Sequence, residues 1–164
     1  MATLLLLTWL LQTPDIHYVP TSNGVAEAML KLAKTAPADV VYDLGSGDGR
    51  IVIAAAKKFG ARGVGVEIDA DLIKDATKNA RKAGVADRVT FRQEDLFKTD
   101  LSDATVVTLY LSTSINMRLR GILQKLKPGT RIVSHRFTFG DWKPDVEQHL
   151  EGTSIYLWTV SGPR

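Results

Sequence analysis

Short apolar runs alternate with longer amphipathic segments along most of this chain. The short runs are rich in β-branched residues, which is typical of buried strands; they cover residues 40–44, 63–68, 89–93, 104–111 and 131–134. Between them, apolar residues recur every three or four positions, as on one face of a helix; these segments are 25–32, 51–59, 70–82 and 115–126. The alternating run 155–160 predicts a terminal strand. The pattern predicts an α/β fold: a doubly wound, mostly parallel sheet with helices on both faces.

The N-terminal segment has a different pattern. Residues 4–11 are strongly apolar and leucine-rich, but the run is too short to span a bilayer and lacks the flanks of a secretory signal. We interpret residues 1–17 as a remnant of an anchor or as a packing arm, and residues 18–164 as a single domain. Weak membrane association through residues 4–11 is a further hypothesis.

Composition narrows the class of protein. The 164 residues are 45% hydrophobic and 24% charged, as in a soluble globular domain. Cysteine is absent and the three histidines are scattered, so we expect no metal site. A net charge of +3 is too mild to suggest nucleic acid as a partner. Residues 104–140 nevertheless contain six basic residues and no acid, which indicates either a solvated face or a patch for an acidic protein or RNA.

A glycine-rich turn follows the first predicted strand. The sequence Asp43-Leu44-Gly45-Ser46-Gly47-Asp48-Gly49-Arg50 has G-x-G-x-G spacing, whereas a dinucleotide fingerprint has G-x-G-x-x-G. Carboxylates at Asp43 and Asp48 would repel a pyrophosphate but attract a ligand with an ammonium and a sulfonium group. S-adenosylmethionine (SAM) carries both groups and no phosphate.

The turn resembles motif I of the class I SAM-dependent methyltransferases, which have a Rossmann-like fold. Its context strengthens the resemblance, because Glu67 ends the second strand and Asp95 follows the third. The resemblance implies that Glu67 binds the ribose and Asp95 the adenine amino group. The full set of cofactor residues that we expect is Tyr18, Thr21, Asp43, Gly45, Ser46, Gly47, Gly49, Glu67, Ile68, Asp95, Leu96 and Tyr110.

On the acceptor side, no catalytic base stands out. Tyr110 and His135 end the fourth and fifth predicted strands, so we expect them to orient the acceptor. The fourth strand ends in Tyr-Leu-Ser-Thr. It lacks the Asn/Asp-Pro-Pro-Tyr motif of relatives that methylate bases or glutamine, which disfavours that geometry.

A closer resemblance rests on several further sequences: Y-V-P-T, E-D-L-F, L-Y-L and L-K-P-G-x-R-I-V-S-x-R-F followed by a tryptophan. Together they are similar to the small mitochondrial lysine methyltransferases of eukaryotes and their bacterial relatives. The resemblance implies methyl transfer to an amine, with a protein lysine as acceptor. A small-molecule O-, N- or S-methyltransferase and a non-catalytic SAM-binding module stay open as alternatives. The need for SAM favours a cytoplasmic location, and a homodimer is a further hypothesis.

Overall fold

The computed structural model describes residues 19–162, so the apolar run 4–11 and Tyr18 lie outside the described residues. The strands are β1 (Val40–Leu44), β2 (Arg62–Glu67), β3 (Val89–Gln93), β4 (Val106–Leu109), β5 (Arg131–His135), β6 (Val146–Leu150) and β7 (Thr153–Thr159). The helices are α1 (Asn23–Leu32), α2 (Arg50–Phe59), α3 (Ala70–Ala83) and α4 (Thr113–Leu123).

These seven strands form one sheet in the order β3-β2-β1-β4-β5-β7-β6. Strands β1 to β5 are parallel, while β7 pairs antiparallel with both β5 and β6. From β1 the chain first adds β2 and β3 on one side, and it then crosses over to add β4 and β5 on the other side. The position between β1 and β4 is therefore the topological switch point of the sheet. The predicted doubly wound, mostly parallel fold is confirmed.

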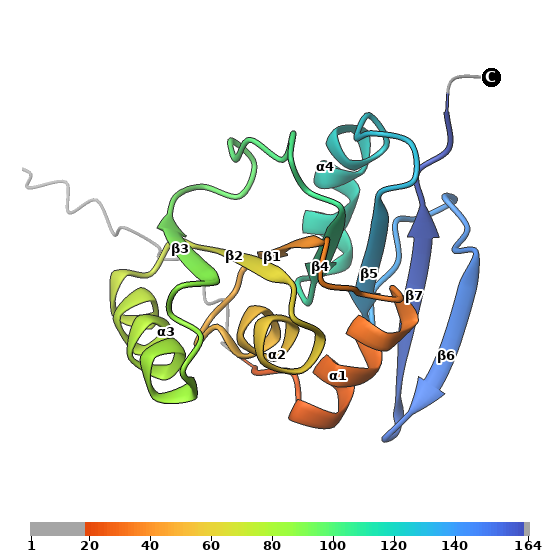
Figure 1. Ribbon diagram of the computed structural model, residues 1–164. Helices are drawn as coiled ribbons and strands as arrows, with labels where there is room; N and C mark the ends of the chain where they lie inside the picture. Colours follow the sequence, from red (N-terminus) through yellow and green to blue (C-terminus); the bar gives the residue numbers. More distant parts are fainter. Residues whose placement is uncertain (1–18, 163–164) are drawn as a thin grey trace, which may run out of the picture.

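Helices cover both faces of the sheet. Figure 1 shows α1, α2 and α3 together on one face and α4 on the other. Alternate residues of a strand pack into the two hydrophobic cores, because successive side chains point to opposite faces of the sheet. Val41 packs with Met29 of α1 and Ile51 of α2, whereas Tyr42 belongs to the cluster of Leu119 and Trp158 on the α4 side.

Local sequence signals explain the helix boundaries. Ser22 caps α1 by accepting from the amide of Val25, and Ser112 caps α4 by accepting from Ile115. The Asp69 carboxylate caps α3 in the same way, and Gly84 ends it in the left-handed conformation. Helix α4 begins before the predicted residue 115 because Ser112 caps it, while β4 is shorter than the predicted 104–111.

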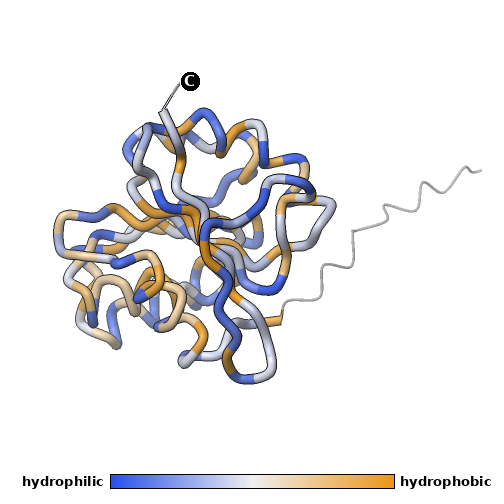
Figure 2. Tube along the Cα trace, turned by 90° about the vertical axis from the view of Figure 1, so that its right-hand side faces the viewer, coloured by the Kyte–Doolittle hydropathy of each residue, from blue (hydrophilic) through white to orange (hydrophobic). Residues whose placement is uncertain are grey.

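Strand β6 was not predicted from the sequence. Its residues Val146–Leu150 are almost all exposed, because it is the outer edge strand of the sheet. Figure 2 views the molecule from this edge, with the β6–β7 hairpin in front. A strand with solvent on both faces has no apolar alternation, which is the pattern that reveals a strand in a sequence. Within residues 19–162, no helix combines the length and the hydropathy needed to cross a membrane.

Candidate functional site

The carboxyl ends of β1 to β5 meet at one edge of the sheet, because these strands are parallel. Open α/β sheets bind their ligands outside this edge, near the switch point. The sequence places Asp43, Glu67 and Asp95 at or just beyond three of these strand ends. The structure therefore gathers the three acids that the sequence analysis selected on the same side of the sheet.

The glycine loop between β1 and α2 lies directly on β2. The amides of Gly45 and Ser46 both donate to the carbonyl of Val66, at 2.8 and 2.9 Å. Close packing requires a glycine on β2, since a Cβ on Gly65 would lie 2.6 Å from the Ser46 hydroxyl and 2.7 Å from Phe91. Within the loop, all three glycines have positive φ: Gly45 at 79°, Gly47 at 53° and Gly49 at 81°.

Asp43 is buried at the foot of this loop. One of its carboxylate oxygens accepts a hydrogen bond of 2.7 Å from the Thr108 hydroxyl on β4. Burial is the main cause that raises the pKa of Asp43 to about 7; the nearby Glu67 and Asp48 contribute in the same direction, and the hydrogen bond from Thr108 opposes them. A cation beside the loop would lower this pKa again and would restore the charge.

Asp48 already has a basic partner beside the loop. Its carboxylate forms a two-pronged ion pair with Arg50, with contacts of 3.0 and 2.7 Å. Arg50 also donates to the carbonyl of Thr21 at 2.8 Å, which ties the glycine loop to the segment before α1. This ion pair offsets much of the Asp48 charge, although Asp48 still contributes to the raised pKa of Asp43.

Glu67 bridges the two turns that border the loop. One carboxylate oxygen accepts from the amide of Gly47 at 3.0 Å, and the other accepts from Ile68 and Asp69 at 2.9 and 3.1 Å. A carboxylate has about four acceptor sites, so with three of them used Glu67 keeps about one for a ligand hydroxyl. The neighbouring Ile68 side chain is 67% exposed, which provides an apolar surface beside this carboxylate.

The turn after β3 presents an acid and two apolar side chains. The Asp95 carboxylate accepts from the amide of Phe97 at 2.9 Å, which fixes the turn. Leu96 and Phe97 are half-buried against the main core. The guanidinium of Arg118 on α4 covers the Phe97 ring at 3.7 Å from its centroid, so this turn is anchored to the helix.

Tyr110 and His135 lie together at the ends of β4 and β5. Their ring centroids are 4.0 Å apart. The Nδ1 of His135 lies 3.2 Å from the Thr21 hydroxyl and its Nε2 lies 3.1 Å from the Thr153 hydroxyl. Burial, aided by Arg136, lowers the pKa of His135 and so favours its uncharged form. Thr21 therefore connects this aromatic pair to the glycine loop through Arg50.

These residues fit SAM by several independent criteria. The loop forms a cradle that a side chain at Gly45 would fill, because a Cβ there would lie 2.8 Å from Leu111. The Ser46 hydroxyl is buried without a hydrogen-bond partner among the described residues. The Glu67 carboxylate, which contacts Gly47, and the exposed Ile68 next to it offer acidic and apolar contacts of the kinds that the ribose and adenine of SAM require. In residues 19–162 no group of three acidic or histidine side chains is arranged to hold a metal ion.

The basic interval does not form one continuous patch. Arg131 pairs with Asp39, Arg120 pairs with Asp141 and Arg118 covers Phe97. Arg136 also lies over the Phe137 ring, 5.6 Å from its centroid. Within the described part of the chain, only Lys125 and Lys127 of the six have neither an ion pair nor a ring contact, so four of the six basic side chains have a structural contact.

Fold and site together define a class I SAM-dependent methyltransferase. The family model of the ANTKMT methyltransferase domain matches residues 43–146. The chain belongs to this family, and the family resemblance inferred from the sequence is confirmed.

Full-length relatives agree with this family. A protein-lysine N-methyltransferase of Saccharolobus islandicus is 44% identical, with 90% of this chain aligned to 95% of that protein. The adenine nucleotide translocase lysine N-methyltransferase of mouse is 38% identical over 90% of this chain. The chain spans 65% of the mouse enzyme's length.

Among solved structures, an RNA methyltransferase from Salinibacter ruber in complex with S-adenosylhomocysteine (SAH) is 58% identical. It superposes with a TM-score of 0.87, covering 89% of this chain and 96% of that chain. That complex supports the expectation of a SAM-type cofactor.

Sequence reasoning missed two residues that shape this site. Thr108 holds the Asp43 carboxylate, and Arg50 connects the loop to Thr21. A threonine inside an otherwise apolar strand was the available signal for Thr108. The contact between Arg50 and Thr21 joins segments 29 residues apart and has no sequence signature.

Proposed function

We propose that this protein transfers a methyl group from SAM to the ε-amino group of a lysine in a protein substrate. The observation that carries the proposal is the 44% identity to an archaeal protein-lysine N-methyltransferase over nearly the whole of both chains. The mouse relative, with 38% identity, also bears the name of a lysine methyltransferase.

For the cofactor, we assign the glycine loop and the acids beside it. Gly45, Ser46, Gly47 and Gly49 would approach it through their backbone, because the glycines carry no side chain in the way. Glu67 would accept from the ribose hydroxyls and Asp95 from the adenine amino group. Ile68 and Leu96 would pack on the adenine ring. Asp43 would supply the negative potential for the methionine end of SAM. The other contacts to the methionine end would come from Thr21, Tyr110 and Tyr18. Tyr18 lies outside the described residues.

When bound, SAM supplies an electrophilic methyl group on its sulfonium. The task of the protein is then to hold the acceptor amine in line with that group and to keep water away. A lysine has to lose its proton first, since its ordinary pKa is about 10.4. An aromatic and apolar surround disfavours the ammonium form and so promotes this loss.

We assign the acceptor side to Tyr110 and His135. Both imidazole nitrogens lie within hydrogen-bond distance of threonine hydroxyls, so His135 serves to hold the Tyr110 ring at 4.0 Å rather than to take up a proton. The Tyr110 ring is half-buried and contacts the rings of His135 and Phe137, and it would contact the incoming amine.

The test is isotope labelling. The protein is incubated with methyl-labelled SAM and a matched proteome, and labelled proteins are digested and sequenced by mass spectrometry. We expect methyl-lysine in a small set of proteins with the wild type and none with the Asp43→Ala variant. Label confined to small molecules would instead support the small-molecule methyltransferase alternative.

RNA is the second candidate acceptor, because the 58% identical structure is that of an RNA methyltransferase. The engagement of Arg118, Arg120 and Arg131 in structural contacts weighs against it. Counting label in the RNA fraction of the same reactions separates the two candidates. RNA binding whose affinity falls steeply with salt would favour the second one.

We also propose weak membrane attachment through residues 4–11, which lie outside the described residues. The support is their apolar composition alone. Cosedimentation with phospholipid vesicles of the full chain, compared with a chain lacking residues 1–17, tests this. A homodimer remains a hypothesis that light scattering of the full chain can test.

A further inference from the structure

A pocket of about 500 Å³ opens beside the aromatic pair Tyr110 and His135. Its walls come from the end of β5, the turn between β6 and β7, and the first turn of α1. Besides the aromatic pair, the residues that matter here are Arg136, Glu151, Gly152 and Thr153. None of the roles assigned above to the cofactor site uses Arg136 or Glu151.

Both charged residues of this pocket have an unusual backbone conformation. Three non-glycine residues among residues 19–162 have positive φ: Lys34 at 51°, Arg136 at 69° and Glu151 at 49°. Lys34 follows the C-cap of α1, the ordinary place for a left-handed residue. The other two line the same pocket, where glycine or asparagine would adopt the conformation at lower cost.

The β6–β7 turn that carries Glu151 shows this unfavourable backbone conformation most clearly. Glu151 and Gly152 are the two central residues of the β6–β7 hairpin, and both have positive φ. Such turns prefer Asn-Gly or Asp-Gly, because two successive residues must be left-handed. Strain of this kind persists where the side chain has a use, and it clusters at binding sites.

The surrounding contacts hold the Glu151 carboxylate and the backbone of Arg136 at the pocket. The Ser22 hydroxyl donates to the Glu151 carboxylate at 2.7 Å and also caps α1 by accepting from Val25. The carboxylate keeps acceptor sites for a further donor. The amide of Arg136 donates to the carbonyl of Ser154 at 2.8 Å, which joins the end of β5 to the same hairpin.

We infer that this pocket recognises a lysine-bearing segment in which an acidic residue adjoins the target lysine. Glu151 attracts the ammonium group at the mouth, and the Arg136 guanidinium pairs with the neighbouring carboxylate, for which its planar fork is suited. Tyr110 and Tyr156 supply aromatic walls for the lysine's methylene chain. The inference rests on the proposed function, since it names the kind of segment that the acceptor site takes.

The test is a titration that needs no turnover. Isotope-labelled protein in complex with SAH is titrated with acetyl-Lys-Glu-amide, acetyl-Lys-Gln-amide and acetyl-Lys-Lys-amide, and the NMR shifts of the Gly152 and Thr153 amides are followed. We expect Lys-Glu to bind about fourfold more tightly than Lys-Gln, the effect of roughly one exposed ion pair. Lys-Lys should bind most weakly.

Charge reversal gives the decisive comparison. Arg136→Glu should invert the order, so that Lys-Lys binds more tightly than Lys-Glu, while Lys143→Glu at an exposed lysine outside the pocket lining should not. Glu151→Gln should weaken all three probes, whereas the matched control Glu147→Gln on the same hairpin should not. An unchanged order in Arg136→Glu, or no shifts at Gly152 and Thr153, would overturn the inference.

Glycine variants separate recognition from folding. Glu151→Gly and Arg136→Gly relieve the positive φ, so their Tm should equal or exceed that of the wild type while binding of Lys-Glu falls. A fall in Tm with unchanged binding would mean that these residues only support the hairpin, and would contradict the inference.

If the wild type binds the probes here but labels no protein, the proposed function fails and the pocket assignment stands. If it labels protein lysines but binds no probe, the pocket assignment fails and the proposed function stands.

Discussion

Asp43 is a buried carboxylate whose charge depends on what lies beside it. Its pKa is raised to about 7, first by burial and then by Glu67 and Asp48. A cationic cofactor needs the ionised form, so its affinity should fall as the pH drops below about 7. From pH 7.5 to 5.5 we expect the Kd of SAM to rise roughly twentyfold, as for one coupled proton. Calorimetric titration across this range measures it.

The Asp43→Asn variant is the control for this pH dependence. It should bind SAM weakly at every pH and show no dependence on this proton. Because the folded pKa of Asp43 is raised, its stabilising contribution without cofactor is complete below about pH 4 and is lost as the pH rises through about 7. The cofactor-free variant should therefore have a higher Tm than the wild type at pH 8. A pH-independent wild-type Kd would contradict the role of Asp43.

Glu67 tests the ribose assignment. Removing its carboxylate in Glu67→Ala deletes an acceptor for the ligand and leaves the amide of Gly47 without its partner. We expect a loss of about 1.5–3 kcal/mol in SAM binding, as for hydrogen bonds to a charged group. Asp95→Ala should cost less. The matched control is Asp71→Ala, which removes an exposed acid of α3 paired with Lys74. An equal loss of SAM affinity in that variant would mean that only the net charge of the protein matters, and would contradict the ribose assignment.

Among the elements, β2 depends on glycine to seat the cofactor loop. A Cβ at Gly65 would collide with Ser46 and Phe91, whereas a Cβ at Gly121 in α4 would meet nothing within 4 Å. Gly65→Ala should therefore lower the free energy of unfolding by about 1–3 kcal/mol and weaken SAM binding. Gly121→Ala should raise stability by up to about 1 kcal/mol and leave binding unchanged. Denaturant unfolding and calorimetry measure both, and similar behaviour of the two variants would exclude this packing argument.

How far the sequence predicts an element depends on how local its signal is. Strands β1 to β5 and their helices were predictable because burial on both faces makes the runs apolar and the helices amphipathic. The glycine loop and Glu67 were recognisable as a motif. Strand β6, Thr108 and Glu151 were not, because an exposed edge strand lacks periodicity and because their partners lie far away in the chain.

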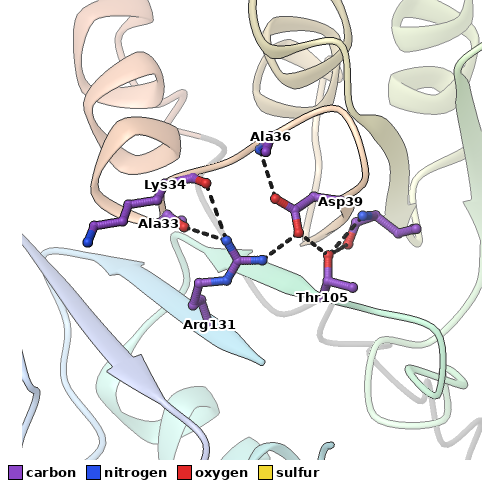
Figure 3. A network of polar contacts seen from close by, with 7 residues as sticks. Ala33, Lys34, Ala36, Asp39, Thr105 and Arg131 are labelled. Carbon is purple, nitrogen blue, oxygen red and sulfur yellow. Dashed lines mark hydrogen bonds and ion pairs between the residues drawn. The ribbon is translucent and has the colours of Figure 1, made fainter. Parts of the chain in front are cut away.

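At the scale of the whole molecule, a second polar network stands at the opposite edge of the sheet from the cofactor loop. Figure 3 shows Arg131 of β5 directed at Asp39 before β1 and at the carbonyls of Ala33 and Lys34 after α1. Thr105 and the amide of Ala36 also donate to the Asp39 carboxylate. Burial opposes ionisation, but these hydrogen bonds outweigh it and hold the pKa of Asp39 below its ordinary value.

Arg131→Met should separate stability from binding. It leaves the Asp39 carboxylate buried without its cation, and since the Arg131 side chain is only 24% exposed we expect a loss of about 2–3 kcal/mol in unfolding free energy. The double variant with Asp39→Asn should recover most of the lost unfolding free energy, because neither charge of the ion pair then remains buried without a partner. The Kd of SAM should change less than about twofold, because substitutions at distant sites affect one another only slightly.

The pH dependence gives this last prediction a second readout. A depressed carboxyl pKa contributes stability above its unfolded value, which is lost as the pH falls through the folded one. The stability difference between wild type and Arg131→Met should therefore shrink in acid, in the opposite sense to the effect of Asp43. If Arg131→Met weakened SAM binding as strongly as Glu67→Ala, the two edges of the sheet would be coupled, and the separation of a structural edge from a functional edge would be wrong.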